Sequence, residues 1–95
     1  IDVEDAGDNF AILDCEFGYA ETATDEFSAT IVISGADDGR IERCKFDSGA
    51  QAAVTAISFE NVTGLLIKDN KIFGDYSTAI IHHPSTNLPS NEVFI

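Results

Sequence analysis

The sequence predicts an all-β chain folded as a parallel β-helix, in which three to four turns of the chain stack on one another. A six-residue motif recurs three times at intervals of 29 and 26 residues, which is the self-similarity expected of a solenoid. Short segments rich in Val, Ile, Phe and Thr surround the copies, whereas helical periodicity is poor throughout. We call each stretch that contains one copy a repeat.

The motif has an apolar residue at its first and last positions and Cys or Asn at its fourth. Its copies are ILDCEF (12–17), IERCKF (41–46) and IKDNKI (67–72). Because the two apolar positions are five residues apart, a flat strand cannot direct both to one face. We therefore expect a sharp bend near Cys15, Cys44 and Asn70, the last because Asn tolerates left-handed backbone geometry.

A second series of strands precedes the motif, at Ile1, Ile31, Ile57 and Ile80. Polar turns connect this series to the motif. The turns are 4–9, 34–38 and 60–64, and the expected return loops are 18–30, 47–56 and 74–79, with a further loop at 83–91. Each repeat is thus expected to contain three short strands joined by corners.

Stacked repeats place equivalent residues above one another at about 4.8 Å. The expected inward columns are Ile12, Ile41, Ile67 and Ile95; Phe17, Phe46 and Ile72; and Cys15, Cys44 and Asn70. Parallel Cys side chains point the same way, which favours free thiols over a disulfide. Outside, the columns Asp14, Arg43, Asp69 and Glu16, Lys45 place opposite charges on neighbouring strands.

Composition bounds the function. The 95 residues allow one domain, and 44% of them are apolar, enough for a core. Seventeen acidic residues against five basic ones give a formal charge of −12, which argues against nucleic acid, anionic membranes and polyanionic sugars as partners. The missing initial Met and the strand-like ends without caps suggest a segment, 1–95, of a larger protein or assembly.

In these repeats, the chain resembles the right-handed parallel β-helix proteins of the pectate-lyase-like superfamily. The motif copies and LLIKDNKIFGDYSTAI (65–80) are similar to repeats found in virion proteins of tailed bacteriophages. The resemblance implies two functions. One is a rigid structural module of a virion, in the capsid or tail, and the other is a polysaccharide-binding or depolymerising β-helix.

Catalytic chemistry finds little support. Asp37 and Asp38 are the only adjacent Asp pair, and they lie in a tight turn where Asp and Gly are common. The resemblance would add three galacturonase motifs, Asn-Thr-Asp, Gly-His-Gly and Arg-Ile-Lys, and none occurs here. We expect no catalytic residues.

Metal binding is a weaker alternative to solvated acidic turns. Asp5, Asp8, Asp37 and Asp38 would meet in one oxygen-rich corner able to hold Ca²⁺, although we expect no cofactor. His82 and His83 point opposite ways on a strand and cannot easily share a metal. His82 is expected inward below Phe59, and a slip of one residue would put His83 there instead.

Aromatic residues in the return loops are the candidate partner-binding residues: Tyr19, Phe27 and Tyr76. The expected function is a non-catalytic virion module, in a virion or outside the cell. Its partners would be other virion chains or further copies of itself, as in a trimer, with carbohydrate as the alternative ligand.

Overall fold

The computed structural model describes residues 1–4, 8–18, 27–76, 81–83 and 90–95. Within these ranges the chain consists of β-strands and connecting turns, without a helix. The strands are β1 (Asp2–Val3), β2 (Ala11–Leu13), β3 (Glu16–Phe17), β4 (Phe27–Ser34), β5 (Arg40–Glu42), β6 (Lys45–Glu60), β7 (Thr63–Lys68), β8 (Lys71–Tyr76), β9 (Ile81–His82) and β10 (Asn91–Phe94). The prediction of an all-β chain is confirmed. No helix of the described part could cross a membrane.

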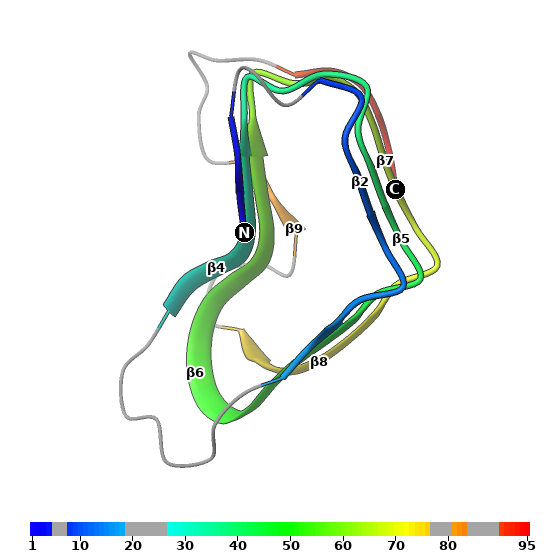
Figure 1. Ribbon diagram of the computed structural model, residues 1–95. Coiled ribbons are helices and arrows are strands. Elements are labelled where there is room, and N and C mark those ends of the chain that lie inside the picture. The colour runs from blue at the N-terminus through cyan, green and yellow to red at the C-terminus, as the bar shows by residue number, and fades with distance from the viewer. Residues whose placement is uncertain (5–7, 19–26, 77–80, 84–89) are drawn as a thin grey trace.

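The strands form two sheets in which every described pairing is parallel. One sheet has the order β1-β4-β6-β3, with β8 and β9 also pairing with β6, and the other has the order β10-β7-β5-β2. In Figure 1, β1, β4 and part of β6 lie opposite β2, β5 and β7, and β8 runs between the two groups. Each pairing joins a segment to its equivalent in the next repeat, which is why the two sheets contain strands so distant in sequence.

The expected columns are present in the registers. Ile12 pairs with Ile41 and Ile41 with Ile67, so one predicted column is confirmed over three repeats. Phe17 pairs with Phe46 and Phe46 with Ile72, which confirms a second. Ile95 departs from the expectation of burial, because it lies beyond the end of β10 and is 76% exposed.

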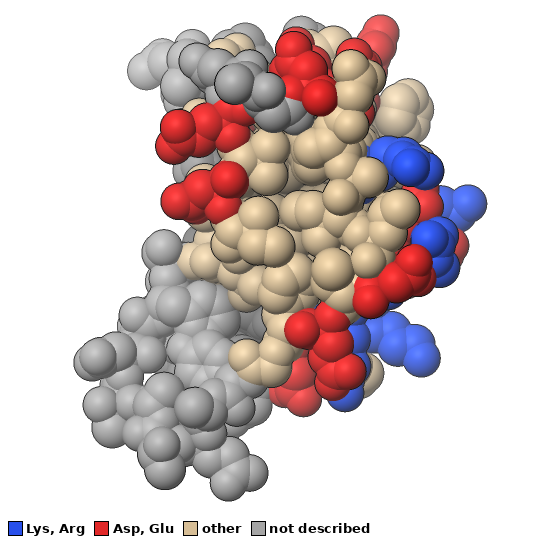
Figure 2. Space-filling model, viewed as in Figure 1, with Lys and Arg blue, Asp and Glu red and all other residues tan. Residues whose placement is uncertain are grey.

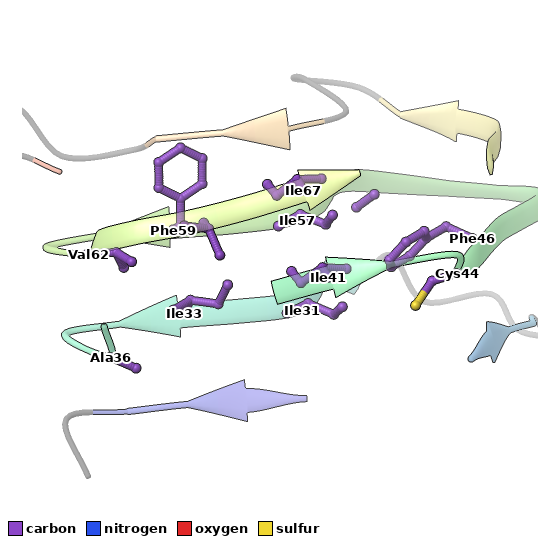
Figure 3. Close-up of a cluster of buried hydrophobic side chains, with 12 residues drawn as sticks. Ile31, Ile33, Ala36, Ile41, Cys44, Phe46, Ile57, Phe59, Val62 and Ile67 are labelled. Carbon is purple, nitrogen blue, oxygen red and sulfur yellow. The ribbon is translucent and has the colours of Figure 1, made fainter. Parts of the chain in front are cut away.

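The core lies between the two sheets (Figure 3). Its fully buried large side chains come from the middle repeats, and they are Phe46, Ile31, Ile33, Ile41, Ile57, Leu65 and Val62. The same columns are only partly buried in the outer repeats, as at Val3, Ile12, Ile72 and Val93. Burial therefore depends on having a neighbouring repeat on both sides.

Three expectations need correction. The segment 47–56, expected as a return loop, lies within β6, which pairs first with β3 and β8 and then with β4 and β9. The expected return loops 18–30 and 74–79 are also partly strand, because β4 begins at Phe27 and β8 extends to Tyr76. The bend itself is confirmed, since the left-handed residues Asp14, Arg43 and Asp69 directly precede Cys15, Cys44 and Asn70.

The third correction concerns the last repeat. Ile81, not Ile80, pairs with Ile57, and His82 pairs with Ser58. His83 therefore lies beside Phe59, with ring centroids 5.3 Å apart, whereas His82 was expected there. The adjacent residues Ile80 and Ile81 are both apolar, so local alternation alone could not choose between them.

Candidate functional site

All five basic residues of the chain lie along one edge of the molecule (Figure 2). They are Arg40, Arg43, Lys45, Lys68 and Lys71, from β5, β7, the starts of β6 and β8, and the corner after β5. Parallel pairing of these elements brings the residues together, since Glu42 pairs with Lys68 and Lys45 with Lys71. We call this surface the charged edge.

An arginine–aspartate pair connects the first two repeats at the charged edge. Arg43 donates from Nε to Asp14 Oδ1 at 2.7 Å and from Nη2 to Asp14 Oδ2 at 3.1 Å. Its Nη1 also contacts Glu42 Oε2 at 3.2 Å. The hydrogen bond from Arg43 holds the pKa of Asp14 below its ordinary value, and the same bond raises the pKa of Arg43.

The backbone explains why these side chains lie side by side. Asp14, Arg43 and Asp69 have φ values of 54°, 53° and 56°, so all three repeats turn in the same left-handed way at this corner. The Asp14 and Arg43 N–H groups donate to the carbonyl oxygens of Glu42 and Lys68, at 3.0 and 3.2 Å. The corners therefore stack like the strands that they join.

A second column of stacked charged residues, Glu16, Lys45 and Lys71, lies two positions after Asp14, Arg43 and Asp69 in each repeat. Lys45 Nζ is 3.4 Å from Glu16 Oε1, so the predicted opposite-charge pair is present. Lys45 also lies 6.0 Å from the ring centroid of Phe73, whose side chain is 49% exposed. The charged edge thus has an exposed aromatic ring beside its lysine column.

A surface depression of about 450 Å³ lies between the two columns. Its lining residues are Asp14, Cys15, Glu16, Arg43, Cys44, Lys45, Asp69 and Lys71. Three acidic and three basic side chains thus surround two thiols. Such a lining can contact charged or polar groups of either sign, but it does not by itself select one ligand.

The charged edge is close to electrically balanced. Its five basic residues accompany four acidic ones, Asp14, Glu16, Glu42 and Asp69, which leaves a charge of +1. The other thirteen acidic residues, seventeen less four, give the remainder of the chain −13. In the sequence, these residues support the register, and the confinement of every Lys and Arg to 40–71 is the signal that could have predicted this edge.

The acidic turns are tied to the backbone. Asp8 Oδ1 accepts the Asp37 N–H at 3.0 Å, and Asp37 Oδ1 accepts the Thr63 N–H at 2.9 Å. Asp38 adopts φ 57° in the same turn, and Asp5 lies outside the described residues. In the part of the chain that is described, no three His, Cys, Asp or Glu residues group as metal ligands. Calcium binding at these turns stays an untested prediction.

The aromatic partner-binding candidates are placed only in part. Tyr19 lies outside the described residues. Phe27 begins β4 and Tyr76 ends β8, while their side chains also lie outside the described part. Their role in binding is untested.

The Cys column is confirmed as free thiols, Cys44 buried and Cys15 partly so. Asn70 continues the column, accepting the Cys44 N–H at 2.9 Å and donating to the Ile41 carbonyl at 3.0 Å.

Comparison of this chain with protein-family models, curated proteins and solved structures found no match.

Proposed function

We propose that this chain is a non-catalytic structural module, a right-handed parallel β-helix segment of a tailed-bacteriophage virion that mediates assembly. The observation that carries the structural role is the run of parallel pairings between equivalent segments 23 to 30 residues apart, such as Ala53 with Tyr76 and Asp2 with Val32. Repetition of one cross-section gives a stiff rod whose neighbouring repeats stabilise each other. The virion context rests on the sequence resemblance alone.

The charged edge is the surface that we propose for contact with other chains. Copies that each carry −12 repel one another, so close approach is most favourable where the local charge is balanced. Ion pairs such as Arg43–Asp14 can exchange partners across an interface at small cost, because they are already exposed to solvent. The proposed partners are two further copies of this chain, with three edges meeting around one axis.

The test is the solution mass of the chain by multi-angle light scattering, at low and at high salt. The proposal expects a trimer that dissociates in the variant Lys71→Ala. Asn61→Asp is the matched control. It also lowers the net charge by one unit, but at an exposed turn residue with φ 51°, a geometry that Asp tolerates. A monomer at every concentration, or equal effects of the two variants, would refute assembly through the charged edge.

Polysaccharide binding is the second candidate function. It is favoured by Phe73, an exposed ring that could stack on a sugar, beside Lys45 and the depression. A glycan screen should then find ligands whose binding is lost in Phe73→Ala. The control Phe94→Ala removes a ring from β10 that is more exposed than Phe73, at 62% against 49%. If neither variant changes binding, the sugar-binding role of this surface is excluded.

A further inference from the structure

The thiols of Cys15 and Cys44 have the same orientation in adjacent repeats. Cys15 Sγ donates to the Leu13 carbonyl at 3.3 Å, and Cys44 Sγ donates to the Glu42 carbonyl at 3.4 Å, each two residues back along its own chain segment. The two acceptors, Leu13 and Glu42, pair directly in the sheet. The thiols are therefore related by the translation that relates one repeat to the next.

The backbone confirms that the repeats are in direct contact at this point. The Lys45 N–H donates to the Cys15 carbonyl at 2.9 Å. Cys44 Sγ also lies 3.5 Å from the Ile12 carbonyl oxygen, which belongs to the repeat of Cys15. The sulfur of Cys44 thus faces the first repeat.

The translation between repeats gives an expected distance between the sulfurs. Two side chains related by the strand translation are separated by about 4.8 Å. A disulfide needs sulfurs about 2.05 Å apart and Cβ atoms about 3.8 Å apart, so it would have to draw the two corners together. Two metal–thiolate bonds of about 2.3 Å in line span about 4.6 Å, which fits the spacing without movement.

Access and charge are compatible with a cation between the sulfurs. Both residues line the depression, and Cys15 is partly exposed although Cys44 is only 2% exposed. The acidic and basic residues of the lining are equal in number.

We propose that Cys15 and Cys44 together bind one soft monovalent cation, Cu(I), in a two-coordinate dithiolate site. Thiolates are the ligands that Cu(I) prefers. Two of them suffice for linear coordination, whereas structural zinc requires four ligands. Both thiol protons leave to solvent as two Cu–S bonds form, and no electron is transferred. Asn70 cannot extend the site while its amide bonds both the Cys44 N–H and the Ile41 carbonyl.

The test is anaerobic titration of the reduced chain with Cu(I) against a Cu(I) chelator, with native mass spectrometry for stoichiometry. We expect one ion per chain, sulfur-to-copper absorption in the ultraviolet, and two sulfur ligands by X-ray absorption. Cys15→Ser should weaken binding by on the order of 100-fold, since the second thiolate acts at high effective concentration. Asp2→Asn removes one negative charge at an exposed position of β1 that does not line the depression, and it should bind as the parent does.

Cys44 is buried, so Cys44→Ser can disturb folding, and circular dichroism of each variant separates misfolding from ligand loss. The half-buried Cys15 keeps the test decisive. Two ions per chain, or one ion that survives Cys15→Ser, would overturn the proposal. Rapid formation of a Cys15–Cys44 disulfide by oxidised glutathione in the folded chain would do so too, because the sulfurs would then lie closer than the stacking distance. None of these outcomes depends on the oligomeric state or on glycan binding.

Discussion

Individual residues take up the strain of the corners. One column of equivalent positions, Asn9, Asp38, Gly64 and Glu92, has positive φ in four successive repeats, with values of 61°, 57°, 81° and 54°. Left-handed geometry costs a non-glycine residue about 1–2 kcal/mol. Hydrogen bonds between stacked corners, such as Asp38 N–H to the Thr63 carbonyl at 2.9 Å, offset this cost. Repetition therefore allows even Glu where Gly would be favoured.

Gly39 is required for a different reason, because it leaves space for a ring. A Cβ at this buried position would overlap the ring of Phe10, which fills the place of the missing side chain. We expect Gly39→Ala to lower the free energy of unfolding by about 1–3 kcal/mol, as overpacking does. Urea denaturation measures the change.

Gly18→Ala is the control for Gly39→Ala. A Cβ there meets nothing within 4 Å, so its effect should stay within about 0.5 kcal/mol. Phe10→Leu should partly rescue Gly39→Ala, because it replaces the ring with a smaller side chain. Equal effects of the two glycine substitutions would show that backbone freedom, not the ring, decides.

The Arg43–Asp14 pair predicts a pH dependence at one carboxylate. The pKa of Asp14 is lowered in the folded chain, so the pair stabilises the fold above the ordinary aspartate pKa of about 3.9. That contribution is lost as the pH falls through the lower, folded-state pKa. NMR titration of the Asp14 carboxyl carbon should show the lowered pKa, and Arg43→Gln should return it to the ordinary range. Arg40→Gln should leave it unchanged, and a shift there would point to the general field of the edge.

At the corner between β5 and β6, a side chain from the neighbouring repeat forms hydrogen bonds to the backbone. Asn70, from the next repeat, satisfies one backbone donor and one backbone acceptor of the second repeat, the Cys44 N–H and the Ile41 carbonyl. Strand β6 then pairs first with β3 and β8 and further along with β4 and β9, curving as it goes (Figure 1). The register of several strands thus depends on a corner that one amide supports.

We expect Asn70→Ala to lower the free energy of unfolding by about 1–3 kcal/mol, because it leaves the Cys44 N–H without its partner. Thr63→Ala, at an exposed position of β7 outside the charged edge, should change it by no more than about 0.5 kcal/mol. Chemical denaturation with hydrogen exchange at the Cys44 amide checks both. If the Cys44 amide stays equally protected from exchange in Asn70→Ala, water replaces the Asn70 side chain as its partner without loss of stability.

The whole molecule combines a core concentrated in the middle repeats with a large negative charge. Phe46, stacked on Phe17 with centroids 4.9 Å apart, is fully buried, whereas Phe17 in the first repeat is only partly so. The charge of −12 opposes compaction through repulsion, and the few exposed ion pairs each contribute at most about 1 kcal/mol. We therefore expect repulsion to be the larger electrostatic effect.

Added salt should consequently stabilise the fold. Raising NaCl from about 0.01 M to about 1 M shortens the screening length from about 30 Å to about 3 Å and removes most of the repulsion. We expect the thermal midpoint to rise over this range. The thermal midpoint of Arg43→Gln should rise as well, because the effect does not depend on the ion pairs of the charged edge. A falling midpoint would show that the ion pairs of the charged edge outweigh the overall repulsion.

The sequence by itself determined the repeat, the inward columns of Ile41 and Phe46, and the opposite-charge pairs, because each follows from alternation and local spacing. The tertiary structure alone decided three things. The Gly- and Ala-containing segment 47–56 becomes strand because β8 and β4 pair with it, despite its loop-like composition. Ile81, not Ile80, takes the position beside Ile57, because in that register His83 lies beside Phe59. The five basic residues meet along one edge because stacking joins residues 26 to 29 apart, a proximity that depends on the register of whole strands.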